Sequence, residues 1–304
     1  MALATVIKKQ DNLYKLGILW LKFIRLYTFY FPIDKGKWRL YQTAKKFCRH
    51  LPKEVLAETK DGRKLCVSLS DWGGDGIFFL GRYESFCTET VSRYIKKGDV
   101  CLDVGANIGW YATLFAKLCG TEGEVHAFEP VPTTFADLQK NVALNQTSPN
   151  VFINNFGLGD VETESEIHLF PDLPIGHASL AAKPNHKSET VPILIKTLDS
   201  YLMERNIRQV DFIKVDIEGA EQMFLRGGKS IFQQKNPPVL FMEMALENTK
   251  EFGYKPNDII SLIKENGEYE FFALDEINEK LILIEDFDDD EMGANVLCVP
   301  RERV

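Results

Sequence analysis

Acidic residues and glycines alternate in one short stretch of the chain, and their types and spacing indicate a ligand site. In Val100–Ala112 (VCLDVGANIGWYA), Asp103 precedes Gly105, Asn107 and Gly109. Glycines at such positions make a tight turn whose backbone N–H groups can approach a ligand closely. The dinucleotide-binding turn G-x-G-x-x-G does not require an acid here. The acid instead suits a ligand with a cationic end, such as S-adenosylmethionine (SAM) with its ammonium and sulfonium groups.

A second acid follows the next predicted strand. Glu129 comes directly after Glu124–Phe128. A carboxylate near this point binds ribose hydroxyls in nucleoside-binding α/β folds. The alternative is a carboxylate at a helix start beside Pro130, which the helix dipole favours. Taken with Asp103 and the glycine turn, Glu129 indicates a site for an adenosine-containing ligand.

A third group of acids lies in Asp211–Gly228 (DFIKVDIEGAEQMFLRGG). Asp216, Glu218 and Glu221 fall at the end of one predicted strand and the start of its helix. Glu218 and Glu221 are three residues apart, so they can share a helix face. A helix N-terminus favours such charges on structural grounds alone. The functional interpretation is a polar rim that faces a transferred methyl group.

Methyl transfer to a hydroxyl requires positioning and then a base that accepts the hydroxyl proton. Asp216 is the first candidate for this base, and Glu218, Glu243 and His177 follow it. His177 lies in Val161–Val191, a long segment that interrupts the strand–helix alternation where a substrate loop would be expected. A histidine there can act as a base near neutral pH if the segment folds over the site.

The elements that position these residues alternate between strands and helices from residue 99 onward. Five strands alternating with helices predict an α/β fold with a parallel sheet wound on both sides. Its carboxyl edge would hold Asp103, Glu129, Asp216 and Glu243, and ligands bind at that edge. The predicted strands are Val100–Val104, Glu124–Phe128, Val151–Asn155, Phe212–Val215 and Val239–Met242, and the predicted helices are Trp110–Leu118, Thr133–Leu144, one from about Gly219, and Pro256–Lys264.

The end of the chain holds three more strand candidates that could complete the sheet. They are Tyr269–Leu274, Lys280–Ile284 and Asn295–Val299. The acidic run Glu285–Glu291 lies between the last two, and we interpret it as a solvated loop and not as a metal site. Asp216 and Glu243 could hold Mg²⁺, but no tandem Asp-Asp or Asp-Asn supports a metal, and none is predicted.

The first 98 residues form two predicted parts ahead of the main domain at 99–304. Residues 51–98 form a cap with a hairpin, Val55–Glu58 and Leu65–Leu69, a loop at Asp71–Gly76 and a lead-in helix at Phe86–Ile95. Residues 1–50 form a basic amphipathic helical extension, with 11 lysines and arginines against two aspartates. The rest of the chain carries a net charge of −17, which argues against a broad nucleic-acid-binding face.

Within the extension, Leu13–Phe31 mixes Leu, Ile, Trp, Phe and Tyr with Lys15, Lys22 and Arg25. The charges exclude a membrane-spanning helix, and no signal-peptide cleavage site is present. This helix can pack on the domain or on a second subunit, or it can lie in a membrane interface.

Six scattered cysteines without a C-x-x-C pair indicate a reducing cytosol, with Cys101 and Cys119 as small core residues. We therefore expect a cytoplasmic protein, with a peripheral contact at the inner face of the membrane as an option.

The chain resembles the FkbM-type family of SAM-dependent methyltransferases. Its D-V-G-A-N-x-G and K-x-D-x-E-G-A-E motifs carry the resemblance together, and neither motif alone is specific. Weaker echoes are GRYE, HASL, PVLFMEM and NVLCVP. The stretches that resemble the family are VCLDVGANIGWYATLFA (100–116), VHAFEPVPTTFADLQKNVALN (125–145), TLDSYL (197–202) and DFIKVDIEGAEQMFLRGG (211–228).

This resemblance implies a class I methyltransferase fold, a seven-stranded, mostly parallel sheet with an antiparallel edge and helices on both faces. It implies SAM as methyl donor and a hydroxyl acceptor on a sugar, glycolipid or secondary metabolite. Asp103, Gly105, Asn107 and Gly109 would line the methionine part of SAM, and Glu129 would hold the ribose.

Five further residues complete the expected site. We place Glu84 and Gly157 on the cofactor side, and Ser179, Glu221 and Glu243 on the acceptor side. Two other functions remain open at the level of sequence. One is a nicotinamide-dependent oxidoreductase, which the missing G-x-G-x-x-G disfavours. The other is a non-catalytic membrane-surface adaptor with a vestigial nucleotide fold.

Overall fold

The computed structural model describes most of the chain, and its residues form two compact units. The first ends at Tyr83 and the second begins at Glu84. The start of the predicted N-terminal helix and residues 289–291 of the acidic run lie outside the described residues. The structure describes residues 19–31, 36–48, 54–69, 73–145, 150–171, 173, 177–288 and 293–304.

The first unit combines helices with a small hairpin. The predicted hairpin is confirmed, since β1 and β2 pair antiparallel. The predicted loop at Asp71–Gly76 is wrong at its end, because a helix begins at Gly74 and buries Ile77 and Phe79. The elements are helical residues 19–25, a π-helical turn Leu26–Tyr30, α2 (Lys37–Cys48), β1 (Val55–Glu58), β2 (Lys64–Val67) and α3 (Gly74–Leu80).

The second unit is built on a sheet of eight strands in the order β13-β12-β14-β11-β10-β3-β4-β5. Its five strands from β11 to β5 are mutually parallel. The α/β class and the parallel centre of the sheet are thus confirmed. The strands are β3 (Val100–Val104), β4 (Glu124–Phe128), β5 (Val151–Asn154), β10 (Phe212–Val215), β11 (Val239–Ala245), β12 (Tyr269–Asp275), β13 (Lys280–Ile284) and β14 (Gly293–Pro300).

The central strands end in register, which brings the acids that follow them together. Val104 on β3 is aligned with Phe128 on β4 and with Val215 on β10. These strands are almost continuous apolar runs that are buried on both faces, as parallel strands covered by helices must be. Glu129 and Asp216 therefore leave the sheet beside the turn that follows β3.

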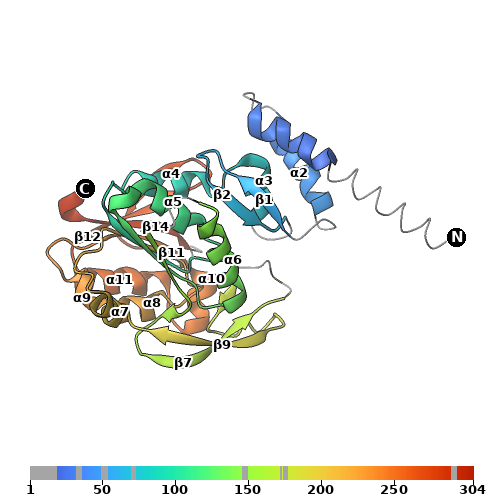
Figure 1. The fold of residues 1–304 in the computed structure, drawn as a ribbon. Helices are drawn as coiled ribbons and strands as arrows, with labels where there is room; N and C mark the ends of the chain where they lie inside the picture. The colour runs from blue at the N-terminus through green and yellow to red at the C-terminus, as the bar shows by residue number, and fades with distance from the viewer. Residues whose placement is uncertain are drawn as a thin grey trace. The chain divides into compact units, whose positions relative to one another are not determined.

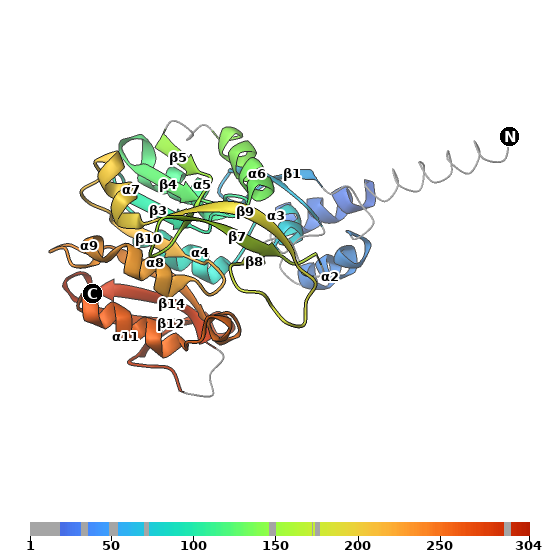
Figure 2. The ribbon, with the colours of Figure 1, turned by 90° about the horizontal axis from the view of Figure 1, so that it is seen from below.

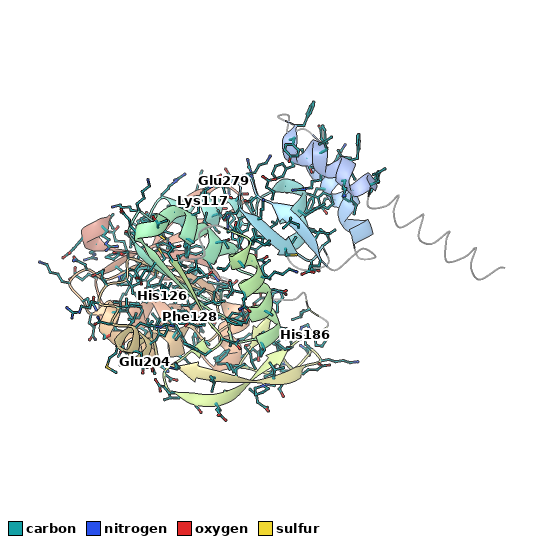
Figure 3. The ribbon with its side chains drawn as sticks, in the orientation of Figure 1. Lys117, His126, Phe128, His186, Glu204 and Glu279 are labelled. Carbon is teal, nitrogen blue, oxygen red and sulfur yellow. The ribbon has the colours of Figure 1, made fainter. Side chains whose placement is uncertain are left out.

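Helices cover both faces of this sheet (Figures 1 and 2). On one face α5 packs its Phe115 ring 5.4 Å from that of Phe212. On the other face, His126 and Phe128 of β4, labelled in Figure 3, contact Tyr201 of α7. The helices are α4 (Ser85–Ser92), α5 (Trp110–Cys119), α6 (Pro132–Ala143), α7 (Leu198–Arg205), α8 (Glu221–Gly227), α9 (Lys229–Phe232), α10 (Leu246–Thr249) and α11 (Pro256–Asn266).

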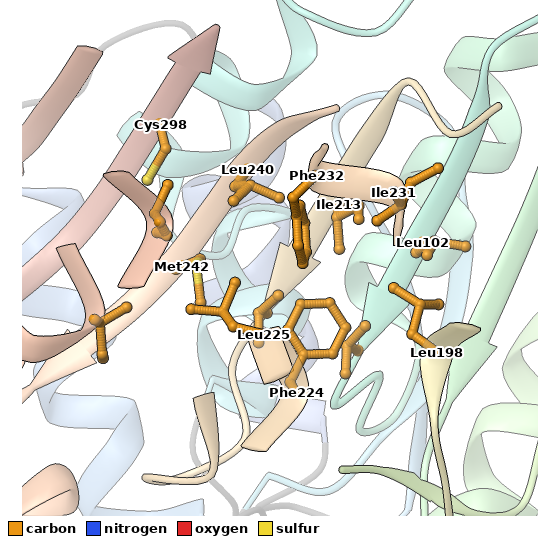
Figure 4. Close-up of a cluster of buried hydrophobic side chains, with 14 of the residues drawn as sticks. Leu102, Leu198, Ile213, Phe224, Leu225, Ile231, Phe232, Leu240, Met242 and Cys298 are labelled. Atoms are coloured by element: carbon orange, nitrogen blue, oxygen red, sulfur yellow. The ribbon is translucent and has the colours of Figure 1, made fainter. Parts of the chain in front are cut away.

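The main core lies between the sheet and the helices α7, α8, α9 and α11. Figure 4 shows part of it, with Phe224 and Phe232 against strand residues such as Ile213, Leu240 and Met242. These side chains are at most 2% exposed, so their burial contributes strongly to the stability of the unit. Cys101 and Cys119 are buried in the unit without a disulfide, as small core residues would be.

The sheet has one strand more than the seven expected. β12 and β14 pair antiparallel, and β13 adds an outer strand to β12. β11 is also longer than expected, because β14 pairs with it as far as Ala245. Glu243 therefore lies within β11, opposite Asn295, and not beyond the end of the strand.

The segment inserted after β5 forms a second sheet of four strands. It encloses a small apolar core in which Ile167, Ile193 and Ile195 pack with Val131. The expected strand at Glu166–Phe170 lies largely within β7. The strands are β6 (Gly157–Leu158), β7 (Thr163–Leu169), β8 (Ala178–Ser179) and β9 (Glu189–Lys196), in the order β6-β9-β7-β8.

Candidate active site

The turn between β3 and α5 has the backbone geometry that its sequence predicts. Gly105, Asn107 and Gly109 have positive φ angles of 77°, 48° and 92°. The N–H groups of Gly105 and Ala106 both donate to the Phe128 carbonyl, at 3.1 and 2.9 Å. A Cβ atom on Gly105 would lie 1.9 Å from the Asp216 carbonyl oxygen. Only glycine can therefore hold the turn this close to the end of β10.

Asp103 is fully buried under this turn. Neither of its carboxylate oxygens makes a hydrogen bond of normal geometry within the described residues. Burial raises the pKa of Asp103, and the Lys214 ammonium group, 3.7 Å from Oδ1, opposes this rise. Beyond this ion pair the two oxygens keep acceptor capacity that no normal hydrogen bond from a described residue uses, which indicates a place for a ligand donor.

Lys214 belongs to this site although the sequence did not predict it. It lies on β10, is 4% exposed, and donates to the Gly105 carbonyl at 2.8 Å. Its ammonium nitrogen also lies 3.4 Å from Asp216. Burial favours the neutral amine, but the carboxylates of Asp216 and Asp103 outweigh burial and raise the pKa of Lys214. A charged residue inside the apolar strand Phe212–Val215 was the available signal.

Glu129 supports the turn from the end of β4. Its Oε2 accepts the Asn107 N–H at 2.9 Å, and its Oε1 accepts the Val131 N–H at 3.0 Å. Burial raises the pKa of Glu129 to about 7, although both N–H groups favour the carboxylate. Its carboxylate therefore links the glycine turn to the start of α6 and keeps further lone pairs for a ligand.

The other two residues expected on the cofactor side lie around this centre. Gly157 opens β6 and lines an apolar cavity of about 40 Å³ together with Gly105 and Phe128. Glu84 precedes α4 with a φ of 42° and accepts a hydrogen bond of 2.7 Å from the Tyr111 hydroxyl. Its charge adds to those that raise the pKa of Lys214.

On the acceptor side, the inserted sheet is tied to the end of β10. His177 Nδ1 lies 3.0 Å from Oε1 of Glu218, and the Ser179 hydroxyl donates to the Glu218 carbonyl at 2.9 Å. The hydrogen bond to Glu218 raises the pKa of His177. Burial alone would raise the pKa of Glu218, but His177 and Lys183 lower it. The structure thus joins three predicted residues, from two distant segments, in one cluster.

This cluster continues through two residues that were not predicted. Lys183 lies 3.3 Å from Oε2 of Glu218 and donates to Asn248 Oδ1 at 3.1 Å. Asn248 in turn donates to Glu243 Oε2 at 3.2 Å. Burial, with the charges of nearby carboxylates, raises the pKa of Glu243 to about 9. A raised pKa favours the protonated carboxyl, which can donate a hydrogen bond.

A hollow of about 470 Å³ lies beside Glu243, within the size range of small-molecule sites. β11, β12, β14 and α10 contribute its walls. Residues that line it are Glu243, Glu247, Lys250, Leu274, Glu276 and Asn295.

Asp216 and Glu221 occupy different surroundings. The Asp216 side chain is 45% exposed and pairs with Lys214. Glu221 is buried, and its two oxygens accept bonds from the Gly219 N–H and the Tyr254 hydroxyl, both at 3.1 Å. Burial raises the pKa of Glu221 to about 7. Within the described residues, no three His, Cys, Asp or Glu side chains gather to hold a metal ion.

The sheet and the site together define a class. Five parallel strands, the antiparallel β14 and a glycine turn after the first central strand form the class I methyltransferase fold. Residues 103–270 match the model of the methyltransferase FkbM domain, which is more than half of the chain. The chain belongs to the FkbM methyltransferase family.

Three curated relatives resemble the chain. Methyltransferase 1 of Beauveria bassiana is 33% identical over 144 residues, covering 41% of this chain and 57% of the relative. Hexuronic acid methyltransferase AglP of Haloferax volcanii is 29% identical over 174 residues, 56% and 63% of the two chains. The 31-O-demethyl-FK506 methyltransferase FkbM of Streptomyces tacrolimicus is 28% identical over 160 residues, 44% and 60%.

The matches thus span about three fifths of the length of these relatives. Among solved structures, a methyltransferase FkbM from Methylobacillus flagellatus KT is similar with a TM-score of 0.39 and 15% identity, over 74% of this chain and 52% of that one.

Proposed function

We propose that this protein transfers the methyl group of SAM to a hydroxyl oxygen of a small-molecule or glycan acceptor. The observation that carries the proposal is the buried Asp103 carboxylate, which has no hydrogen bond of normal geometry and lies under a glycine turn. Family membership supports methyl transfer. Two relatives, whose names state hexuronic acid and 31-O-demethyl-FK506, support an oxygen acceptor.

The residues present fit SAM. The ammonium group of its methionine part would satisfy Asp103, and the backbone of Gly105 and Gly109 allows close approach of that part. The lone pairs that Glu129 retains would accept from the ribose hydroxyls. When bound, SAM supplies a methyl group on a positively charged sulfur, which a nucleophilic oxygen can displace.

His177 is the residue that we assign to the acceptor proton. Glu218 accepts from Nδ1–H, which orients the ring and places the basic lone pair of the neutral imidazole on Nε2. Asp216 came first in the sequence-based ranking, but its carboxylate is engaged in an ion pair with Lys214, and within the described residues no bonded partner orients it toward an acceptor as Glu218 orients His177. Glu218 acts through His177 and is a positioning residue.

The acceptor would enter through the hollow beside β11. Protonated Glu243 can donate to an acceptor oxygen, and Asn295 and Glu276 offer further polar atoms at the wall. Carboxyl and amide groups of this kind bind hydroxyl-rich molecules well. A sugar ring or a hydroxylated metabolite therefore suits this hollow.

Calorimetric titration of the full chain with SAM tests the donor. We expect saturable binding, with weaker binding of NAD. Absence of heat at millimolar SAM, with protein that is folded by circular dichroism, would overturn the donor assignment, and stabilisation by NAD but not by SAM would establish the oxidoreductase alternative instead.

Incubation with methyl-labelled SAM and separate panels of neutral sugars, hexuronates and hydroxylated macrolides tests the acceptor. We expect label on an acceptor oxygen, as an alkali-stable ether. Label that appears only as an alkali-labile ester, or on carbon, in every productive panel would contradict a hydroxyl acceptor.

A further inference from the structure

The helix at residues 19–31 of the first unit exposes a row of large apolar side chains. Six of them are between 39% and 69% exposed, more than an ordinary surface helix presents. The five that lie in the helix, up to Tyr30, recur at helical spacing and share one side of it, and Phe31 follows the helix in extended backbone. They are Leu19, Trp20, Phe23, Leu26, Tyr30 and Phe31, and we call them the aromatic stripe.

A different side of the same helix already anchors it to the first unit. Leu21, Ile24 and Phe29 are buried. The Thr28 hydroxyl donates to the Phe79 carbonyl at 2.6 Å, and Arg25 Nε donates to the Phe78 carbonyl at 2.9 Å. The helix is therefore held in place without the aromatic stripe, whose exposure the packing of the unit does not explain.

The positive charge around the aromatic stripe indicates which kind of surface the stripe can bind. The first 50 residues carry a net charge of +9, against −17 for the remainder. In the described part of the first unit, Lys22 and Arg39 are exposed on the helices at residues 19–31 and 37–48. Basic side chains next to exposed Trp, Tyr, Phe and Leu are typical of helices that lie in the headgroup region of anionic membranes.

We propose that the aromatic stripe docks this protein on an anionic lipid surface, with the helix lying in the plane of the membrane. No helix among the described residues is long and apolar enough to cross a bilayer. The apolar side chains would insert at the level of the headgroups while the lysines and arginines pair with lipid phosphates. This inference is independent of the methyl-transfer proposal, because no residue of the candidate active site takes part.

Flotation of the full chain with lipid vesicles tests the proposal. The vesicles contain either phosphatidylcholine alone or phosphatidylcholine and phosphatidylserine at 3:1. We expect at least tenfold stronger partition onto the anionic vesicles, and weaker partition in high salt. The triple variant Leu19→Ser, Phe23→Ser, Leu26→Ser should lose at least tenfold in partition onto them.

The matched control replaces three exposed apolar residues of the second unit, Val161→Ser, Met203→Ser and Ile277→Ser, and should partition like the wild type. Circular dichroism and thermal unfolding verify that both variants fold. Equal partition of the wild type and the stripe variant would overturn the proposal. So would a wild-type dimer in light scattering that the stripe variant abolishes while neither protein floats, since the stripe would then join two copies of the chain.

Discussion

The ammonium nitrogen of Lys214 lies 3.7 Å from the carboxylate Oδ1 of Asp103, and both side chains are buried. The same nitrogen holds the Gly105 carbonyl and pairs with Asp216. One cation thus joins the two sequence stretches that carry the family resemblance. A buried cation among two carboxylates and a carbonyl sets both the charge and the shape of the turn.

Replacement of Lys214 by methionine should therefore destabilise the second unit. Loss of one partner leaves Asp103 buried without a cation, which costs about 3–5 kcal/mol of the free energy of unfolding. The pKa of Asp103 should rise further. Urea denaturation measures the first effect, and calorimetry should show weaker SAM binding.

Two further variants are needed to interpret the effect of Lys214→Met on stability and SAM binding. The exposed Lys229→Met in α9 is the control and should change the unfolding free energy by less than about 0.5 kcal/mol. The double variant Asp103→Asn, Lys214→Met should recover part of the stability but not the SAM affinity. If Lys214→Met is as stable as the control, the pair has no structural role.

Alanine substitutions at two glycines with similar φ angles distinguish the cost of backbone strain from the cost of a steric clash. Gly105 (φ 77°) lies against the Asp216 carbonyl, whereas an added Cβ at Gly253 (φ 79°) meets nothing within 4 Å. Gly253→Ala should cost about 1–2 kcal/mol of the unfolding free energy, and Gly105→Ala more than about 3 kcal/mol. Thermal and urea unfolding compare them, and equal costs would show that the turn can move away from β10.

Glu129→Gln should weaken SAM binding at least tenfold, which corresponds to about 1.4 kcal/mol. The two carboxylate oxygens of Glu129 each accept one backbone N–H, from Asn107 and from Val131. Glutamine has only one acceptor oxygen, so its NH₂ group would point at one of these two N–H donors. Calorimetry measures the loss. The exposed Glu162→Gln serves as the control, and an affinity of Glu129→Gln equal to that of this control would remove Glu129 from the binding site.

The pH dependence of methyl transfer should follow His177. Glu218 raises the pKa of His177, so the neutral, basic form appears only above the ordinary value of about 6.5. The rate should fall as the pH is lowered through this raised pKa. Glu218→Gln should shift that limb to lower pH, whereas His177→Gln should abolish it. Rates that do not change with pH between about 6 and 9 would exclude His177 as the base.

The interaction between His177 and Glu218 can also be tested in the absence of a methyl acceptor. Because the folded-state pKa of His177 is raised, its bond to Glu218 stabilises the fold fully below pH about 6.5, and this contribution is lost as the pH rises through the folded-state pKa. NMR titration of the imidazole, assigned with His177→Gln, should show a lower pKa in Glu218→Gln. An unchanged pKa would mean that the hydrogen bond does not form in solution.

The centre of the fold could be predicted because its signals are local. β3, β4 and β10 have the bounds expected from their apolar runs, and α5 differs by one residue at its end. In a parallel sheet, short strands that end together place the residues that follow them at one edge. From this rule the sequence predicted that Asp103, Glu129 and Asp216 lie at the same edge of the sheet.

The parts that were missed depend on contacts between distant segments. Lys214 acquires its role from Gly105, 109 residues away, and Asn248 acquires its role from Lys183, 65 residues away. The hydrophobic periodicity of a sequence does not show which distant residues form such hydrogen-bonded pairs. Glu243 was placed beyond its strand because the extension of β11 depends on pairing with β14, which no local pattern of β11 shows.

The Ser179 hydroxyl and the His177 ring reach Glu218 from β8 and its flank, while Asp103 and Glu129 belong to other elements. Under the proposed roles, the residues that bind the donor and those that meet the acceptor are encoded in separate blocks of the gene. Residues 161–191 can therefore diverge among relatives while the donor-binding turn stays unchanged. Exchange of this block would replace His177 and Ser179 while the donor-binding turn and the lining of the hollow beside β11 stay unchanged.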